Sequence, residues 1–285
     1  MPPLGSSIAN TIVETFNVHV QEVSLVLSVT DRKGKFVNSL SPSDLTVLDN
    51  GAAQTRLTFF ERQTDLPLKV AIVLDISASV AYRFDDEQRT IKSFLKAVVR
   101  PFDSVMLYAF NQDVQFAAPV TNNWKELVRH VKKLDLQGDT ALYDAVSAAA
   151  GWLSSDPSPA RRIMILISDG EENTSAQTID EAITTVLRSE AAIYAVNVNL
   201  FRDSKEANQG VAILKRLTDA TGGTYLEASE GDNMDSAFSK IRRELRSQYA
   251  LGYKLPNPGT WTFHRLQILV PRQLRVRCRL GYFVK

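Results

Sequence analysis

The chain has 285 residues and 44% of them are hydrophobic, so it is long enough to bury one large core or two smaller ones. Its 33 lysines and arginines nearly balance its 32 aspartates and glutamates, which leaves no overall field to attract nucleic acid or an anionic membrane. The composition predicts a soluble globular protein whose partner is recognised by a local site.

A single cysteine, Cys278, excludes an intrachain disulfide and a zinc site built from thiolates. The three histidines lie far apart without metal-ligand spacing, so we expect surface or core residues at His19, His130 and His264. No apolar run approaches the roughly 20 residues needed to cross a bilayer, so no membrane span is expected. Residues 1–10 have neither the basic nor the apolar region of a signal peptide, and none is predicted there.

The first part of the chain, from about residue 16 to residue 62, is predicted to form short strands separated by turns. Apolar residues indicate strands at 23–30 and 45–48, and turn-forming sequences follow at 31–34 and 49–51. This flank has too few strands to close a hydrophobic core by itself.

The middle of the chain, from about residue 66 to residue 248, alternates apolar strands with amphipathic helices, which is typical of parallel βαβ units. Strands are predicted at 69–74, 104–110, 114–116, 162–167, 193–198 and 224–226. Helices are predicted around 91–99, 124–134, 142–153, 179–187, 211–218 and 238–245. The order of these elements predicts an α/β fold with a doubly wound, mostly parallel sheet.

Two local signals refine this α/β region. A short polar turn separates the strands at 104–110 and 114–116, so we expect a hairpin that adds one antiparallel edge strand. Thr178 and Glu181 are three residues apart, which predicts a capping box at the start of a helix.

The last part of the chain is again predicted to be strands, at 249–253, 262–270 and 274–282. Together the two flanks have enough strands for a β-sandwich, and we expect the α/β domain to be inserted into it. The expected boundaries are 1–66 for the amino-terminal part of the sandwich, 67–248 for the α/β domain and 249–285 for the carboxyl-terminal part.

Three arginines alternate with apolar residues in the last predicted strand. Arg275, Arg277 and Arg279 are typical of a strand with one face in water and the other in a core. The alternative is a basic contact patch, but no aromatic residues interleave as a single-strand nucleic-acid binder needs. We therefore expect a solvated face.

Side chains with oxygen atoms follow two of the predicted buried strands and precede one helix. The sequence Asp75-Ile76-Ser77-Ala78-Ser79 follows the strand at 69–74, and Asp169 follows the strand at 162–167. Thr140 lies just before the helix at 142–153. Because the carboxyl edge of a parallel sheet is where such folds bind ligands, we expect these loops to meet there. Hard oxygen donors favour Mg²⁺ or another hard divalent cation.

These three segments, in this order and spacing, resemble the metal-ion-dependent adhesion site of von Willebrand factor A domains. The resemblance implies a Rossmann-like domain in which Ser77, Ser79 and Thr140 bind Mg²⁺, or Mn²⁺ or Ca²⁺, through their hydroxyls. It implies that Asp75 and Asp169 act directly or through water. It also implies a non-enzymatic adhesion module whose cation captures an Asp or Glu carboxylate of a partner protein.

The two flanks carry a further resemblance. The turn-rich segments at 29–34, 44–47 and 49–51, and the carboxyl-terminal segments at 246–253 and 279–282, resemble bacterial A-domain-related proteins first noted in acidobacteria. Members of that group usually carry an export signal, so the resemblance implies an extracytoplasmic or secreted protein.

Other interpretations of the same residues remain open. An Asp-x-Ser-x-Ser sequence can simply cap backbone amides where a strand meets a helix. A magnesium-dependent phosphatase of the haloacid dehalogenase type would use Asp75 as nucleophile, but it needs a carboxylate two residues later, where Ser77 stands. A scaffold without metal is the third possibility. We expect Asp139, Asp144, Glu171 and Glu172 to be rim or supporting residues rather than ligands.

Overall fold

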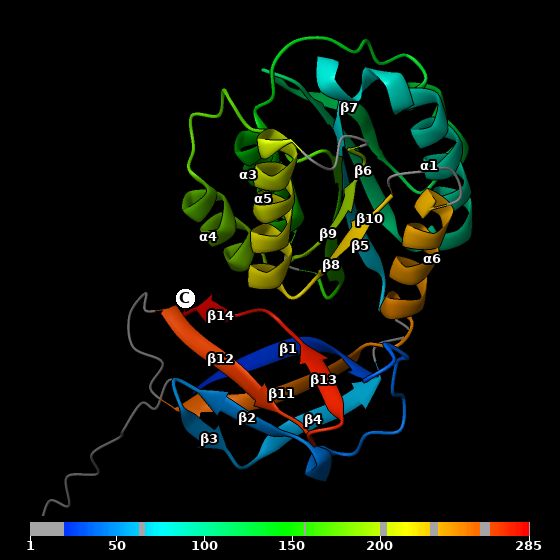
Figure 1. Ribbon diagram of the computed structural model, residues 1–285. Helices are drawn as coiled ribbons and strands as arrows, with labels where there is room; N and C mark the ends of the chain where they lie inside the picture. Colours follow the sequence, from blue (N-terminus) through cyan, green and yellow to red (C-terminus); the bar gives the residue numbers. More distant parts are fainter. Residues whose placement is uncertain are drawn as a thin grey trace, which may run out of the picture.

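The chain folds into three β-sheets, one of which is covered by helices (Figure 1). The computed structural model describes residues 20–62, 66–156, 158–199, 204–228, 233–256 and 263–284.

The central sheet has six strands in the order β10-β9-β8-β5-β6-β7. Its strands are β5 (Leu68–Asp75), β6 (Ser104–Phe110), β7 (Val114–Thr121), β8 (Arg161–Ser168), β9 (Ala192–Asn197) and β10 (Thr224–Glu227). All neighbours pair in parallel except β6 and β7, which are antiparallel. The predicted mostly parallel sheet and its antiparallel edge strand are therefore confirmed, and β7 extends beyond the predicted three residues.

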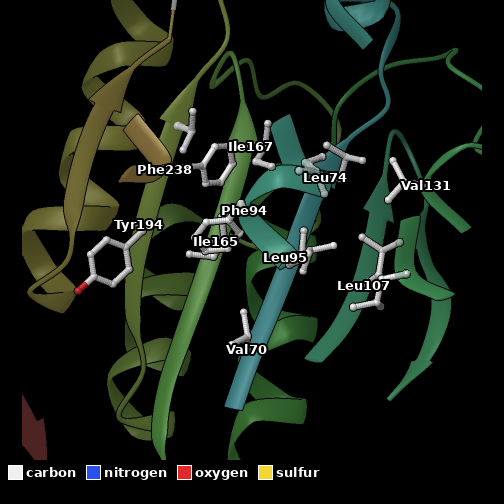
Figure 2. Packing of buried hydrophobic residues seen from close by; sticks show 14 of the residues in the cluster. Val70, Leu74, Phe94, Leu95, Leu107, Val131, Ile165, Ile167, Tyr194 and Phe238 are labelled. Atoms are coloured by element: carbon white, nitrogen blue, oxygen red, sulfur yellow. The ribbon is translucent and has the colours of Figure 1, made fainter. Parts of the chain in front are cut away.

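Helices cover both faces of this sheet, which is why β5 is buried at all of its positions. One face is covered by α1 (Phe84–Val98), α2 (Trp124–Val131) and α6 (Asn233–Leu245), and the other by α3 (Leu142–Ser154), α4 (Ile179–Ser189) and α5 (Lys205–Thr221). Figure 2 shows the first face, where Phe94 and Phe238 lie with ring centroids 4.6 Å apart above the strands. The predicted capping box at Thr178 and Glu181 is present at the start of α4.

Helix bounds differ from the predictions at four places. α2 ends at Val131, before the predicted end near residue 134, and α1, α5 and α6 each begin several residues earlier than predicted. Among the described residues, no helix is both long enough and apolar enough to cross a membrane.

The two flanks of the chain combine in two four-stranded sheets, which we call the flank module. One sheet has the order β13-β1-β11-β4 and the other β14-β12-β2-β3, so each sheet takes two strands from each flank. The strands are β1 (Val20–Asp31), β2 (Thr46–Asp49), β3 (Ala52–Gln54), β4 (Leu57–Arg62), β11 (Tyr249–Pro256), β12 (Phe263–Leu269), β13 (Leu274–Arg277) and β14 (Gly281–Phe283). Buried residues from both sheets, such as Leu25, Val47, Leu251 and Ile268, share one hydrophobic cluster.

The predicted strand at 274–282 is wrong, because the chain forms two strands there. β13 pairs with β1 in one sheet, and β14 pairs with β12 in the other, so residues 278–280 carry the chain between sheets. The alternation of apolar and charged residues continues through residues 278–280, so the sequence does not indicate that the chain passes from one sheet to the other there. The start of the predicted amino-terminal flank, residues 16–19, and residue 262 of the predicted strand at 262–270 lie outside the described residues.

The expectation that all three carboxyl-terminal arginines face solvent is also wrong. Arg275 is exposed, but Arg277 lies 3.3 Å from the buried carboxylate of Glu244 on α6. Arg279 is buried, pairs with Glu190 at 3.4 Å and donates to the Ser24 carbonyl at 2.9 Å. These two guanidinium groups attach the flank module to the α/β part of the chain.

One buried carboxylate joins the two sheets of the flank module. Asp49 on β2 accepts hydrogen bonds of 2.7 Å from the hydroxyls of Tyr253 on β11 and Tyr282 on β14. Its other oxygen lies 2.7 Å from Nδ1 of His264 on β12. Burial, followed by the bond to Asp49, raises the pKa of both phenols, so they stay protonated and donate.

Candidate metal-binding site

Three loops meet beside the carboxyl ends of β5 and β8, as the sequence predicts. The Ala78 amide donates to the Gly138 carbonyl at 3.2 Å, which joins the first loop to the second. The Asn173 amide donates to the Thr140 carbonyl at 3.1 Å, which joins the second loop to the third. Backbone contacts therefore bring the segments of all five predicted ligands to one edge of the sheet.

Asp75 is the buried centre of the first loop. One of its oxygens, Oδ1, accepts from the Ser77 amide at 2.9 Å and from the Ser77 hydroxyl at 2.6 Å. The Ser77 and Ser79 hydroxyl oxygens are 3.1 Å apart, so these three predicted residues lie together. Because the Ser77 hydroxyl is the donor in its hydrogen bond to Asp75, the lone pairs of its oxygen remain available to a cation.

Thr140 and Asp169 are held in place by hydrogen bonds with residues of the loop at 169–173. Both are buried, with exposures of 1% and 3%. The Thr140 amide donates to Oδ1 of Asn173 at 2.8 Å, and the Glu171 amide donates to Oδ1 of Asp169 at 3.0 Å. The negative charge of Asp169 acts on Asp75, so the two predicted carboxylates are close enough to repel each other.

The pKa of Asp75 shows the cost of placing these carboxylates together. Burial, followed by the charge of Asp169, raises it from 3.8 to about 7, although hydrogen bonds from Ser168 and Ser77 oppose the shift. A bound divalent cation supplies the positive charge that such a pair lacks. Two carboxylates and three hydroxyls thus fit a hard cation such as Mg²⁺. Among the described residues, no cluster of three or more His, Cys, Asp or Glu side chains offers a different kind of metal site.

Sequence reasoning missed two polar residues that build the site. Ser168 donates its hydroxyl proton to Oδ2 of Asp75 at 2.6 Å, and Asn173 holds the backbone of Thr140. The only signal for Ser168 is its place at the end of a buried strand, directly before Asp169. Nothing in the sequence links Asn173 to a threonine 33 residues away.

The four residues expected at the rim play different parts. Asp139 is exposed. Asp144 accepts from the amides of residues 176 and 177, and Glu172 accepts from those of residues 174 and 175, so both shape the loop before α4. Burial and the charges of Asp169 and Glu206 raise the pKa of Glu171, which places Glu171 beside the candidate site.

Residues 70–172 match the family model of the von Willebrand factor type A domain. The matched stretch begins in β5 and ends in the loop that follows Asp169, so it contains all five predicted ligands. This part of the chain is therefore similar to von Willebrand factor A (VWA) domains. No curated protein matches the chain.

Solved structures with VWA-type folds are similar to this chain at low sequence identity. The von Willebrand factor type A protein from Catenulispora acidiphila is 12% identical with a TM-score of 0.55, and the match covers 94% of this chain and 76% of that one. BatB from Bacteroides thetaiotaomicron is 16% identical with a TM-score of 0.53, covering 63% of this chain and 100% of that one. The von Willebrand factor domain of the type V pili tip protein Mfa5 from Porphyromonas gingivalis is 13% identical with a TM-score of 0.52, covering 62% and 94%. These similarities establish the fold.

Proposed function

We propose that this protein is a metal-dependent binding module that captures an Asp or Glu side chain of a partner protein. Ser77, Ser79 and Thr140 bind a divalent cation through their hydroxyls, and Asp75 and Asp169 contact it directly or through water. The cation, Mg²⁺ or else Mn²⁺ or Ca²⁺, supplies an attachment point for the incoming carboxylate. The observation that carries the proposal is the buried pair of repelling carboxylates, surrounded by hydroxyl groups, at the ligand-binding edge of the sheet.

The ligand chemistry explains why a partner carboxylate is the expected addition. The three hydroxyl ligands carry no charge, and carboxylates acting through water neutralise the cation incompletely. The Ser77 hydroxyl donates its hydrogen bond to Asp75, so the lone pairs of its oxygen point away from that carboxylate. The site residues therefore hold the metal while leaving charge for a ligand to balance.

The similar structures support a role outside the cytoplasm. One of them belongs to a pili tip protein of a bacterium. We extend the proposal to an extracytoplasmic, bacterial A-domain-related protein of the acidobacterial type, in which the flank module forms a β-sandwich that carries the VWA domain as an insertion at residues 67–248. The sandwich then serves as the support for the binding edge.

Calorimetric titration with MgCl₂ or MnCl₂ tests the metal site. The wild-type chain is expected to show one site, and Asp75→Ala is expected to abolish it because the central carboxylate is gone. Asp139→Ala is the matched control, since it removes an exposed carboxylate from the neighbouring loop. If the folded wild-type protein shows no heat of metal binding, the proposal is wrong. A melting temperature unchanged by EDTA would favour a metal-free scaffold.

The geometry does not favour the phosphatase alternative. The residue two positions after Asp75 is Ser77, whose hydroxyl donates to that aspartate and cannot act as the required acid. A partner pull-down in the presence and absence of EDTA separates the remaining possibilities, because only the binding module loses its partner when the metal is removed.

A further inference from the structure

We infer that Ser168 and Gly210 are positioning residues of the proposed metal site, because they hold the Asp169 loop from two sides. Neither belongs to the five predicted ligands. The inference rests on the function proposed above. The hydroxyl of Ser168 and the absence of a side chain at Gly210 together fix the position of Asp169.

Ser168 connects the two loops that carry the carboxylates. It is the last residue of β8 and is fully buried. Its hydroxyl donates to Oδ2 of Asp75 at 2.6 Å and accepts from the Gly170 amide at 2.9 Å. Removing the hydroxyl leaves one oxygen of Asp75 without this donor and releases the turn at Gly170 on the far side of Asp169.

Gly210 allows α5 to touch the same loop with its backbone. A Cβ atom at Gly210 would lie 2.3 Å from the carbonyl oxygen of Asp169, and one at Gly170 would lie 2.4 Å from the carbonyl oxygen of Gly210. Both distances are far shorter than a van der Waals contact. Helix and loop therefore fit together only because both residues are glycine.

α5 cannot simply retreat from an added methyl group. Leu214 and Leu217 are fully buried among α3, α4 and the sheet. At the other end of the helix, the Leu280 amide of the flank module donates to the Ala220 carbonyl at 2.9 Å. Gly222, which ends the helix, lies against the backbone of Cys278. Because the helix is fixed in the core and on the flank module, a side chain at position 210 must displace the Asp169 loop instead.

Mg²⁺ affinity of the full chain, measured by calorimetry, tests the inference. Ser168→Ala and Gly210→Ala are each expected to weaken Mg²⁺ binding by about 10-fold or more, as is usual when the groups that orient metal ligands are removed. Two matched controls make the same chemical changes elsewhere. Ser189→Ala removes a buried hydroxyl from α4, and Gly151→Ala adds a methyl group to α3 where no atom lies within 4 Å. Both controls are expected to bind Mg²⁺ as the wild type does.

Ser168→Thr separates positioning from packing, because it keeps the hydroxyl and is expected to recover most of the lost affinity. If Gly210→Ala fails to unfold cooperatively in EDTA, Ser168→Ala still decides the matter, since it adds no atom. A wild-type chain that binds Mg²⁺, with both alanine variants binding equally well, would overturn this inference and leave the proposed function intact. A wild-type chain that binds no Mg²⁺ would overturn both.

Discussion

Replacing Asp49 with alanine is expected to lower the free energy of unfolding by about 3–5 kcal/mol, because two buried tyrosine hydroxyls each lose their acceptor at a cost of about 1–3 kcal/mol. The Asp49 side chain is only 2% exposed and accepts hydrogen bonds from Tyr253 and Tyr282. It also contacts the part-buried ring of His264, so the variant removes a polar partner from three side chains. Since β2, β11, β12 and β14 meet at this carboxylate, both sheets of the flank module lose a connection.

Asp49→Asn sharpens the test because it keeps the shape of the side chain. Its carbonyl oxygen can accept from both tyrosines in place of the carboxylate oxygen, so a cost of about 1 kcal/mol or less is expected. Urea unfolding followed by circular dichroism measures both variants. Glu61→Ala, an exposed change on β4, is the control and should stay within about 0.5 kcal/mol of the wild type. Equal losses for Asp49→Ala and Asp49→Asn would contradict the role assigned to these hydrogen bonds.

Without divalent cations, the protein is expected to lose stability as the pH rises from about 4 to about 7. The folded-state pKa of Asp75 is raised from 3.8 to about 7, so in this window the folded protein retains a proton that the unfolded chain has released. Stability falls with pH wherever the folded state binds more protons. At about 1.4 kcal/mol for each pKa unit, the contribution of this one buried group is at most about 4 kcal/mol.

Urea unfolding in EDTA at a series of pH values measures this effect, and Asp75→Asn removes the titrating group. The variant is expected to show a flatter pH profile and, at pH 7, a higher stability than the metal-free wild type. Adding Mg²⁺ at pH 7 is expected to stabilise the wild type but not the variant, because the cation binds only the native site. Parallel pH profiles for wild type and variant would show that burial and Asp169 do not act on Asp75 as described.

Local patterns in the sequence predict most of the α/β part. The strand β5 is a continuous apolar run because helices cover both faces of a parallel sheet, and such a run is visible without any partner. The capping box of α4 lies within four residues. Asp75 and Asp169 are recognisable because each stands where a buried strand ends, and the carboxyl ends of parallel strands lie at one edge of the sheet.

Contacts between distant segments are decided only by the tertiary structure. The crossing between β13 and β14 depends on which strand each one pairs with, and β1, the partner of β13, lies at the other end of the chain. Arg277 and Arg279 have the same alternating pattern as the exposed Arg275, and only the tertiary positions of Glu244 and Glu190 give them ion-pair partners.

The candidate site, too, has features that the sequence predicts and features that only the tertiary structure sets. The sequence by itself determined which oxygen-bearing residues stand at the ends of the strands, because that property belongs to a few consecutive residues. Only the tertiary structure decided what holds them there: the hydroxyl of Ser168 on Asp75, the side-chain oxygen of Asn173 on the Thr140 amide, and the backbone of Gly210 against Asp169. A contact between residues that are far apart in the chain has no periodicity and no motif, since it exists only after the helices have packed on the sheet.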